Sequence, residues 1–96
     1  MMMYLMSMIE DESDRRLFAV MYQAHHAALE RAALGILHNT QDAEDAVQNA
    51  WLQILRHFST ISQLPGGEIH YYLLPVVKNE ALMLLRKSHN LSLIHI

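Results

Sequence analysis

The sequence contains no cysteine, and only two prolines and three glycines occur among its 96 residues. Without cysteine, the chain has no disulfide framework, no zinc ribbon and no thiol chemistry, which suits a reducing cytosol. The scarcity of proline and glycine argues against an all-β fold, because such a fold needs many tight turns. No apolar run approaches the roughly 18–20 residues of a membrane-spanning helix. We therefore expect a cytoplasmic protein with no membrane segment.

Charged residues are also scarce, at 18% of the chain, whereas 52% of the residues are apolar. This composition is too apolar for a disordered segment, and the length suffices for one domain with a single core. The net charge of −3 is unevenly distributed. Residues 1–50 carry eight acids and three bases, and residues 51–96 carry two acids and four bases. The acidic half and the mildly basic half are suited to different partners.

Three segments repeat apolar residues at the spacing of a helix. In residues 17–37 the repeated positions are Phe18, Met21, Tyr22, His25, Ala28, Leu29, Ala32, Ala33 and Ile36. The next helix has an unbroken apolar stripe of Ala43, Ala46, Val47, Ala50, Trp51, Ile54, Leu55 and Phe58. A third helix is predicted over residues 68–87, with an inner face of Ile69, Leu73, Val76, Val77, Glu80 and Leu84.

The ends of these helices follow from capping and helix-breaking residues. Asp11 or Ser13 is suited to cap the first helix, and Asn39 or Thr40 the second. Residues 59–67 are predicted to form the loop before the third helix, since they are polar and end in Pro65-Gly66-Gly67. Pro75 then predicts either a kink or a break at which a new helix begins, because an interior proline costs about 3 kcal/mol or more.

Together these segments predict an all-α fold, a compact bundle of three long helices. Residues 1–12 are expected to form a lead or a short N-terminal helix. This lead is apolar but lacks the basic start of a signal peptide, so we do not expect export. Residues 91–96 match the translation of an adapter used in sequencing libraries. We therefore expect a C-terminally truncated domain of residues 13–90 with a non-native tail of residues 91–96.

The residue types on the second and third helices are more specific than the helical spacing of their apolar positions. The second begins with Asp42-Ala43-Glu44-Asp45-Ala46-Val47-Gln48, and about thirty residues later come Val77-Lys78-Asn79-Glu80-Ala81 and Leu85-Arg86-Lys87. These runs resemble region 2 of the sigma-70 family of bacterial RNA polymerase sigma factors, closest to the extracytoplasmic-function branch. The resemblance implies a transcription initiation domain that binds core RNA polymerase and recognises and melts the promoter minus-ten element. An anti-sigma factor is a further candidate partner.

The resemblance also implies two binding sites. The second helix would dock on the clamp helices of the largest polymerase subunit through Asp45, Gln48, Asn49 and Leu52. The third helix would hold the non-template DNA strand through Tyr71, Tyr72, Lys78, Asn79, Arg86 and Lys87. Tyrosine can stack on an unpaired base, the basic residues can pair with phosphates, and Asn79 can contact a base edge or a sugar. The preceding loop would add the polar side chains of Ser59, Thr60, Ser62 and Gln63.

Other classes of function find less support in the residues. Seven histidines invite a metal site, but His25 and His26 diverge by about 100° on a helix, so we expect no metal and no cofactor. No nucleophile–base pair or phosphate-binding loop is present, so we expect no enzyme. The alternative is a helical protein-interaction module that binds polymerase or a regulator without recognising DNA. The family usually has Glu at the position of Asn49 and Asp at that of Met83, which would fit such a module.

Overall fold

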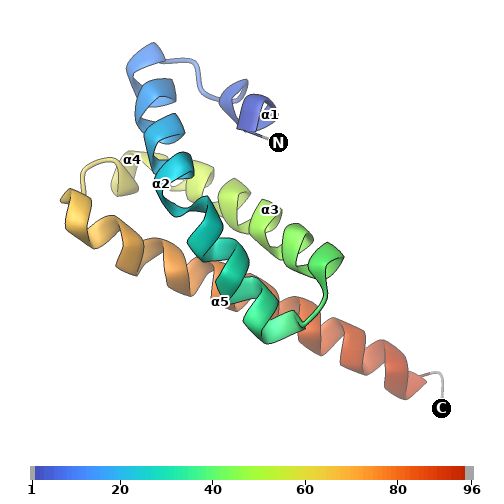
Figure 1. Ribbon diagram of the computed structural model, residues 1–96. Helices are drawn as coiled ribbons and strands as arrows, with labels where there is room; N and C mark the ends of the chain where they lie inside the picture. Colours follow the sequence, from blue (N-terminus) through green and yellow to red (C-terminus); the bar gives the residue numbers. More distant parts are fainter. Residues whose placement is uncertain (1, 95–96) are drawn as a thin grey trace.

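The computed structural model describes the backbone of residues 2–94 and the side chains of residues 4–88. Within this part the helices are α1 (Met2–Met6), α2 (Glu12–Leu37), α3 (Thr40–Arg56), α4 (Phe58–Ile61) and α5 (Gly66–Ile94). The long helices α2, α3 and α5 pack against one another, and α1 lies against α2 and α3 (Figure 1). The predicted all-α bundle of three long helices is therefore confirmed.

The core forms where the predicted apolar stripe of α3 meets α2 and α5. Trp51 is completely buried, and its ring meets that of Phe18 from α2 edge to face, with centroids 5.5 Å apart. Every residue of the predicted stripe is buried except Leu55, which is half-buried. On α5 the buried positions are Leu73, Val77 and Ala81. Burial of large aromatic and aliphatic side chains is the main favourable contribution to folding, so this core fixes which face of each helix points outward.

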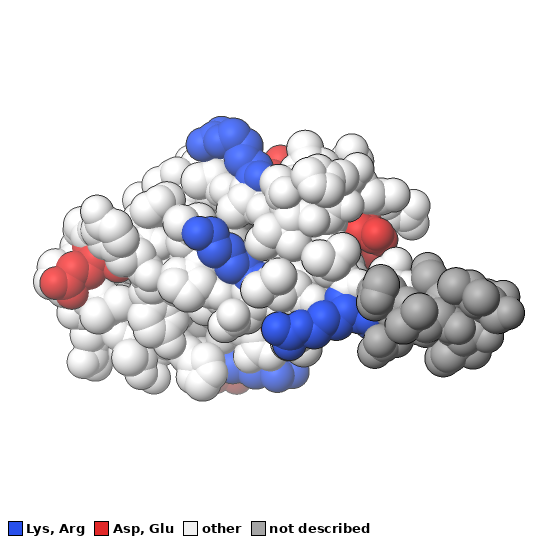
Figure 2. Space-filling view, turned by 90° about the horizontal axis from the view of Figure 1, so that it is seen from below, with Lys and Arg blue, Asp and Glu red and all other residues white. Residues whose placement is uncertain are grey.

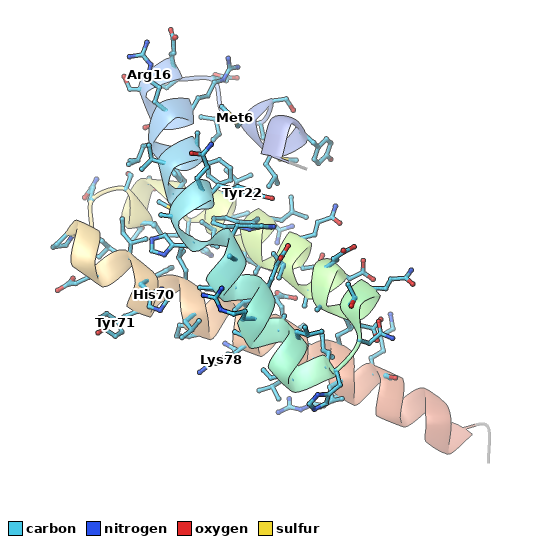
Figure 3. The ribbon with its side chains drawn as sticks, in the orientation of Figure 1. Met6, Arg16, Tyr22, His70, Tyr71 and Lys78 are labelled. Atoms are coloured by element: carbon cyan, nitrogen blue, oxygen red, sulfur yellow. The ribbon has the colours of Figure 1, made fainter. Side chains whose placement is uncertain are left out.

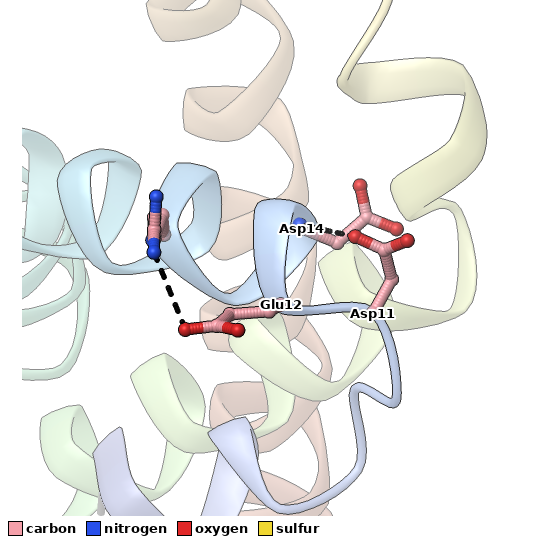
Figure 4. Close-up of polar contacts among 4 residues, drawn as sticks. Asp11, Glu12 and Asp14 are labelled. Atoms are coloured by element: carbon pink, nitrogen blue, oxygen red, sulfur yellow. Dashed lines mark hydrogen bonds and ion pairs between the residues drawn. The ribbon is translucent and has the colours of Figure 1, made fainter.

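Polar caps determine where α2 and α3 begin. The Asp11 side chain accepts a hydrogen bond from the backbone N–H of Asp14 at 3.1 Å, and Glu12 pairs with Arg16 one turn later (Figure 4). The Asn39 side chain accepts in the same way from the N–H of Asp42 at 3.0 Å. Of the caps that the sequence offered, the structure uses Asp11 and Asn39. Each satisfies a backbone donor that the first helical turn leaves free.

The connection from α3 to α5 differs from the loop predicted over residues 59–67. The short helix α4 occupies its first part, and α5 already begins at Gly66. Phe58 and Ile61, one turn apart, are both buried, so α4 fills the end of the core. The prediction of one long loop was wrong because polar residues separate Phe58 from Ile61, so the sequence shows no apolar helical pattern there.

Pro75 lies inside α5, which runs without a break from Gly66 to Ile94. The alternative in which a new helix begins at Pro75 is therefore wrong. The proline is exposed, so its ring needs no space in the core. The predicted non-native tail, residues 91–96, lies outside the residues whose side chains the structure describes. None of the described helices is long and apolar enough to cross a membrane.

Candidate functional site

The outward face of α3 carries the four residues predicted to dock on polymerase. Asp45 and Asn49 are exposed, whereas Gln48 and Leu52 are half-buried. Asn49 follows Asp45 by four residues, and Leu52 follows Gln48 by four, which is close to one helical turn or about 6 Å along the axis. The opposite side of the same turns is buried, through Ala46, Val47, Ala50 and Trp51. The core therefore holds α3 so that all four predicted residues share one outward surface, which we call the docking face.

Charge changes sign along α3. Asp42 lies in the first turn, Glu44 and Asp45 follow in the next, and Arg56 occupies the last turn. Acids near a helix N-terminus and a base near its C-terminus both interact favourably with the helix dipole, so these charges stabilise α3. Between the charged ends the docking face presents amides and the apolar Leu52. A partner would therefore meet an acidic end, a neutral centre and a basic end.

A shallow groove of about 390 Å³ runs along the outward side of α5. It is lined by Tyr71, Leu74, Pro75, Lys78, Asn79 and Leu82, which recur at steps of three and four residues. Tyr71 is 77% exposed. Figure 3 shows that Tyr71 and Lys78 project from the same side of the helix. The structure thus brings together three of the six predicted DNA-binding residues, and we call this surface the α5 groove.

The other three predicted DNA-binding residues lie outside the groove. Tyr72 is half-buried and packs against the core. Arg86 is exposed and follows Asn79 by two turns, so it lies on the same side of α5, whereas Lys87 is about 100° further round. Figure 2, which views the molecule from below, shows a few Lys and Arg side chains on a largely uncharged surface that also carries some Asp and Glu. The positive charge of this face is sparse.

Pro75 changes the backbone within the α5 groove. Proline has no N–H, so the carbonyl of Tyr71, four residues earlier, lacks its normal helical donor. Because Pro75 is exposed and lines the groove, this acceptor lies on the outward side of α5. Leu74 and Pro75 were not predicted to belong to this site. Their spacing of three and four residues from Tyr71 was the available indication.

The loop residues predicted to form a wall of the DNA pocket are not part of the α5 groove. Its lining includes none of Ser59, Thr60, Ser62 and Gln63. Ser62 instead donates a hydrogen bond to the carbonyl of Ser59 at 3.3 Å. Ser59 lines a second cleft together with Met8 and Leu55. The Ser62 hydroxyl therefore stabilises the turn after α4 in this structure.

Two histidines meet beside Tyr71. The ring of His25 on α2 lies 5.6 Å from that of His70 on α5, and the rings of His70 and Tyr71 are 6.1 Å apart. Burial lowers the pKa of His25, and the neighbouring His70 lowers it further. His25, one of the positions that repeat at helical spacing in residues 17–37, is half-buried at the edge of the interface between α2 and α5. In the described part of the chain, no three potential ligands gather as a metal site would require.

Comparison with known families adds one result. Residues 21–90 match the family model described as Sigma-70 region 2. This match covers well over half of the chain and contains every candidate residue of the docking face and of α5. It begins within α2, so α1 and the connection to α2 lie outside it. No curated protein and no solved structure matches the chain.

Proposed function

The chain belongs to the sigma-70 region 2 family, which acts in transcription initiation, and on that basis we propose two specific contacts for it. The first is with core RNA polymerase through the docking face of α3. The second is with the non-template strand of the promoter minus-ten element through α5. One observation carries the proposal: the matched segment holds both predicted surfaces outward on separate helices, each fixed by buried residues on its opposite side.

The docking face suits a basic, amphipathic helix such as the clamp helices of the largest polymerase subunit. The exposed carboxylate of Asp45 can accept charge-assisted hydrogen bonds from an arginine. Gln48 and Asn49 can donate and accept at the neutral centre, where Leu52 offers a small apolar contact. An apolar centre with a polar surround is the usual arrangement of a protein–protein interface.

The α5 groove suits a single strand with unpaired bases. The exposed ring of Tyr71 is free to stack on a base, which contributes about 1–3 kcal/mol. Lys78 can pair with a phosphate, and Asn79 can contact a base edge or a sugar. Extruding a base costs a few kcal/mol, so several such contacts are needed to hold an open strand. With so few basic residues, we expect weak DNA binding without polymerase.

The proposal extends to the setting in which the domain works. We place it in the extracytoplasmic-function branch, in the cytoplasm, with an anti-sigma factor as a further candidate partner. The support for the branch is the resemblance of the run from Asp42 to Gln48, and of the Lys78-Asn79 pair, to its members.

Polymerase binding is tested by replacing Asp45 and Gln48 with alanine. Both side chains lie on the outward face of α3, so the variant should fold, with a melting temperature close to that of the wild type. Its affinity for core polymerase should fall about tenfold or more, or roughly 1.4 kcal/mol per factor of ten. Gln23→Ala, an exposed amide on α2, is the matched control and should bind as the wild type does. A wild-type chain that does not bind polymerase would contradict the proposal.

DNA recognition is tested separately on the reconstituted holoenzyme. Promoter opening should appear as permanganate-reactive thymines in the minus-ten element and as run-off transcripts. Binding to polymerase without opening would favour the alternative, a protein-interaction module. One observation fits that alternative: Met83, where the family usually has an acid, is an apolar side chain that is 59% exposed.

A further inference from the structure

A cleft of about 450 Å³ lies where the N-terminal segment, residues 2–11, meets α3 and α4. Met8 and Ile9, in the connection between α1 and α2, form one side of it. Leu52 and Leu55 of α3, with Phe58 of α4, supply most of the remaining apolar surface. The residues that match the family model begin at position 21, so one side of this cleft is built from a segment outside the match.

Backbone and side-chain contacts hold the N-terminal side of the cleft in place. Ile9 is buried, and its carbonyl accepts a hydrogen bond from Nε of Arg15 on α2 at 2.5 Å. The N–H of Ile9 donates to the carbonyl of Met6 at 3.1 Å, and Leu5 of α1 is fully buried. Met8 nevertheless leaves 52% of its apolar side chain exposed. The cleft is therefore formed before any partner binds, with an apolar side chain at its edge.

The cleft continues the docking face of α3. Leu52 belongs to both surfaces, and Gln48 lies one turn before it. Asp45 precedes Leu52 by seven residues, about 10 Å along the helix axis. A helix of ordinary length that contacts Asp45 and Gln48 would therefore reach the cleft without a bend. An occupant of the cleft is thus expected to be part of the same partner.

Charges around the cleft indicate the chemistry of that occupant. Asp14 and Arg56 both line it, and neither forms an ion pair with another described side chain. Asp14 and Asp45 suit basic residues of a partner, whereas Arg56 suits an acidic one. The apolar surface between them suits a large aliphatic or aromatic side chain.

We propose that this cleft receives an apolar side chain of the polymerase segment that docks on α3. The occupant is an amphipathic helix whose apolar residue is flanked by a basic residue on one side and an acidic residue on the other. Met8 and Ile9 then form part of the polymerase interface, although they lie outside the family match. This inference rests on the proposed polymerase binding and adds the N-terminal segment to its contact surface.

The test compares Met8→Glu with the wild-type chain in binding to core polymerase. A carboxylate at the edge of the cleft would have to be desolvated against an apolar partner, so affinity should fall roughly tenfold or more. Met8→Leu, which keeps the apolar volume, should bind as the wild type does. Tyr4→Glu is the matched control, because Tyr4 is 59% exposed on α1 and does not line the cleft. Its affinity should also be unchanged.

A second variant tests the opposite side of the cleft. Ser59 is exposed on α4 and lines the cleft, so Ser59→Phe should fill it and weaken binding without disturbing the core. Thermal melting of each variant checks that the fold is intact. If Met8→Glu and Ser59→Phe bind normally while the Asp45/Gln48 double alanine variant does not, the inference is overturned and the docking face stands. If the wild type does not bind polymerase, both fail.

Discussion

The indole N–H of Trp51 on α3 donates a hydrogen bond to Nδ1 of His26 on α2, 3.1 Å away. Tryptophan is only a donor, so Nδ1 of His26 must be the acceptor. The hydrogen of the imidazole is then on Nε2, which lies 2.7 Å from Oε1 of Glu30. Tyr22 stacks on the same imidazole, with ring centroids 4.3 Å apart. A polar chain thus links α2 to the helix that carries the docking face.

Replacing His26 by leucine should destabilise the fold. Trp51 is fully buried, so its N–H would lose its partner and remain without a hydrogen bond. An unsatisfied buried donor costs about 1–3 kcal/mol, which urea denaturation can measure. Gln23→Leu, at an exposed position of the same helix, should stay within about 0.5 kcal/mol of the wild type. Equal stability of the His26 and Gln23 variants would show that the hydrogen bond contributes nothing.

Pro75→Ala should stabilise the chain. Proline is about 3 kcal/mol less favourable than alanine inside a helix, and alanine would restore the hydrogen bond to the carbonyl of Tyr71. The gain should be smaller by about 0.4–1 kcal/mol, because proline also restricts the unfolded chain. Pro75 is exposed, so the change removes no core contact. A lower midpoint in chemical denaturation would contradict this prediction and indicate that α5 depends on its proline.

Acid should weaken the fold through His25. Burial, and then the neighbouring His70, lower the pKa of His25 below its ordinary 6.5. As pH falls, the unfolded chain therefore binds a proton at this site before the folded chain does. The contribution of neutral His25 to the free energy of unfolding is fully present above about pH 6.5 and is lost as pH falls through the lowered pKa.

Other titratable groups lie close to His25. His70 faces it from α5, and Tyr22 and His26 lie on its own helix. We expect the free energy of unfolding of His25→Gln to depend less on pH between about pH 7 and about pH 5 than that of the wild type. Gln23→Ala, at an exposed position of the same helix that does not titrate, should keep the wild-type dependence. Parallel curves for His25→Gln and the wild type would refute the role of His25.

Much of the fold could be predicted because it depends on local chemistry. The apolar stripe of α3 has no interruption, and only one of its faces can be buried. Asn39 caps this helix with its own side chain, a contact that spans three residues. Such short-range patterns can be recognised without knowing what the helix packs against.

The remaining features depend on contacts between distant segments. α4 is stable because Phe58 and Ile61 are buried in the core, which four residues alone do not reveal. Helix α5 continues through Pro75 because Leu73, Val77 and Ala81 pack on both sides of it, and this packing outweighs the lost hydrogen bond. The cleft beside Leu52 exists only because the N-terminal segment folds back onto α3, which no local pattern predicts.

Lys78 and Tyr71 should contribute to DNA binding in different ways. In the holoenzyme, Lys78→Ala should reduce the salt dependence of binding to a single-stranded minus-ten oligonucleotide. The slope of log affinity against log salt should change by about 0.7 for one lost phosphate contact. Tyr71→Ala should weaken binding by about 1–3 kcal/mol and leave the slope unchanged, because stacking involves no ion release.

Arg16→Ala is the control for Lys78→Ala, because it also removes one positive charge. Arg16 lies near the start of α2, far from Lys78 on α5 (Figure 3). Its partner Glu12 is exposed, so losing the ion pair should leave the fold intact. If Arg16→Ala changed the salt slope as much as Lys78→Ala, only net charge would be acting. A smaller slope for Lys78→Ala alone, with lost affinity for Tyr71→Ala, would mean that the strand lies in the α5 groove.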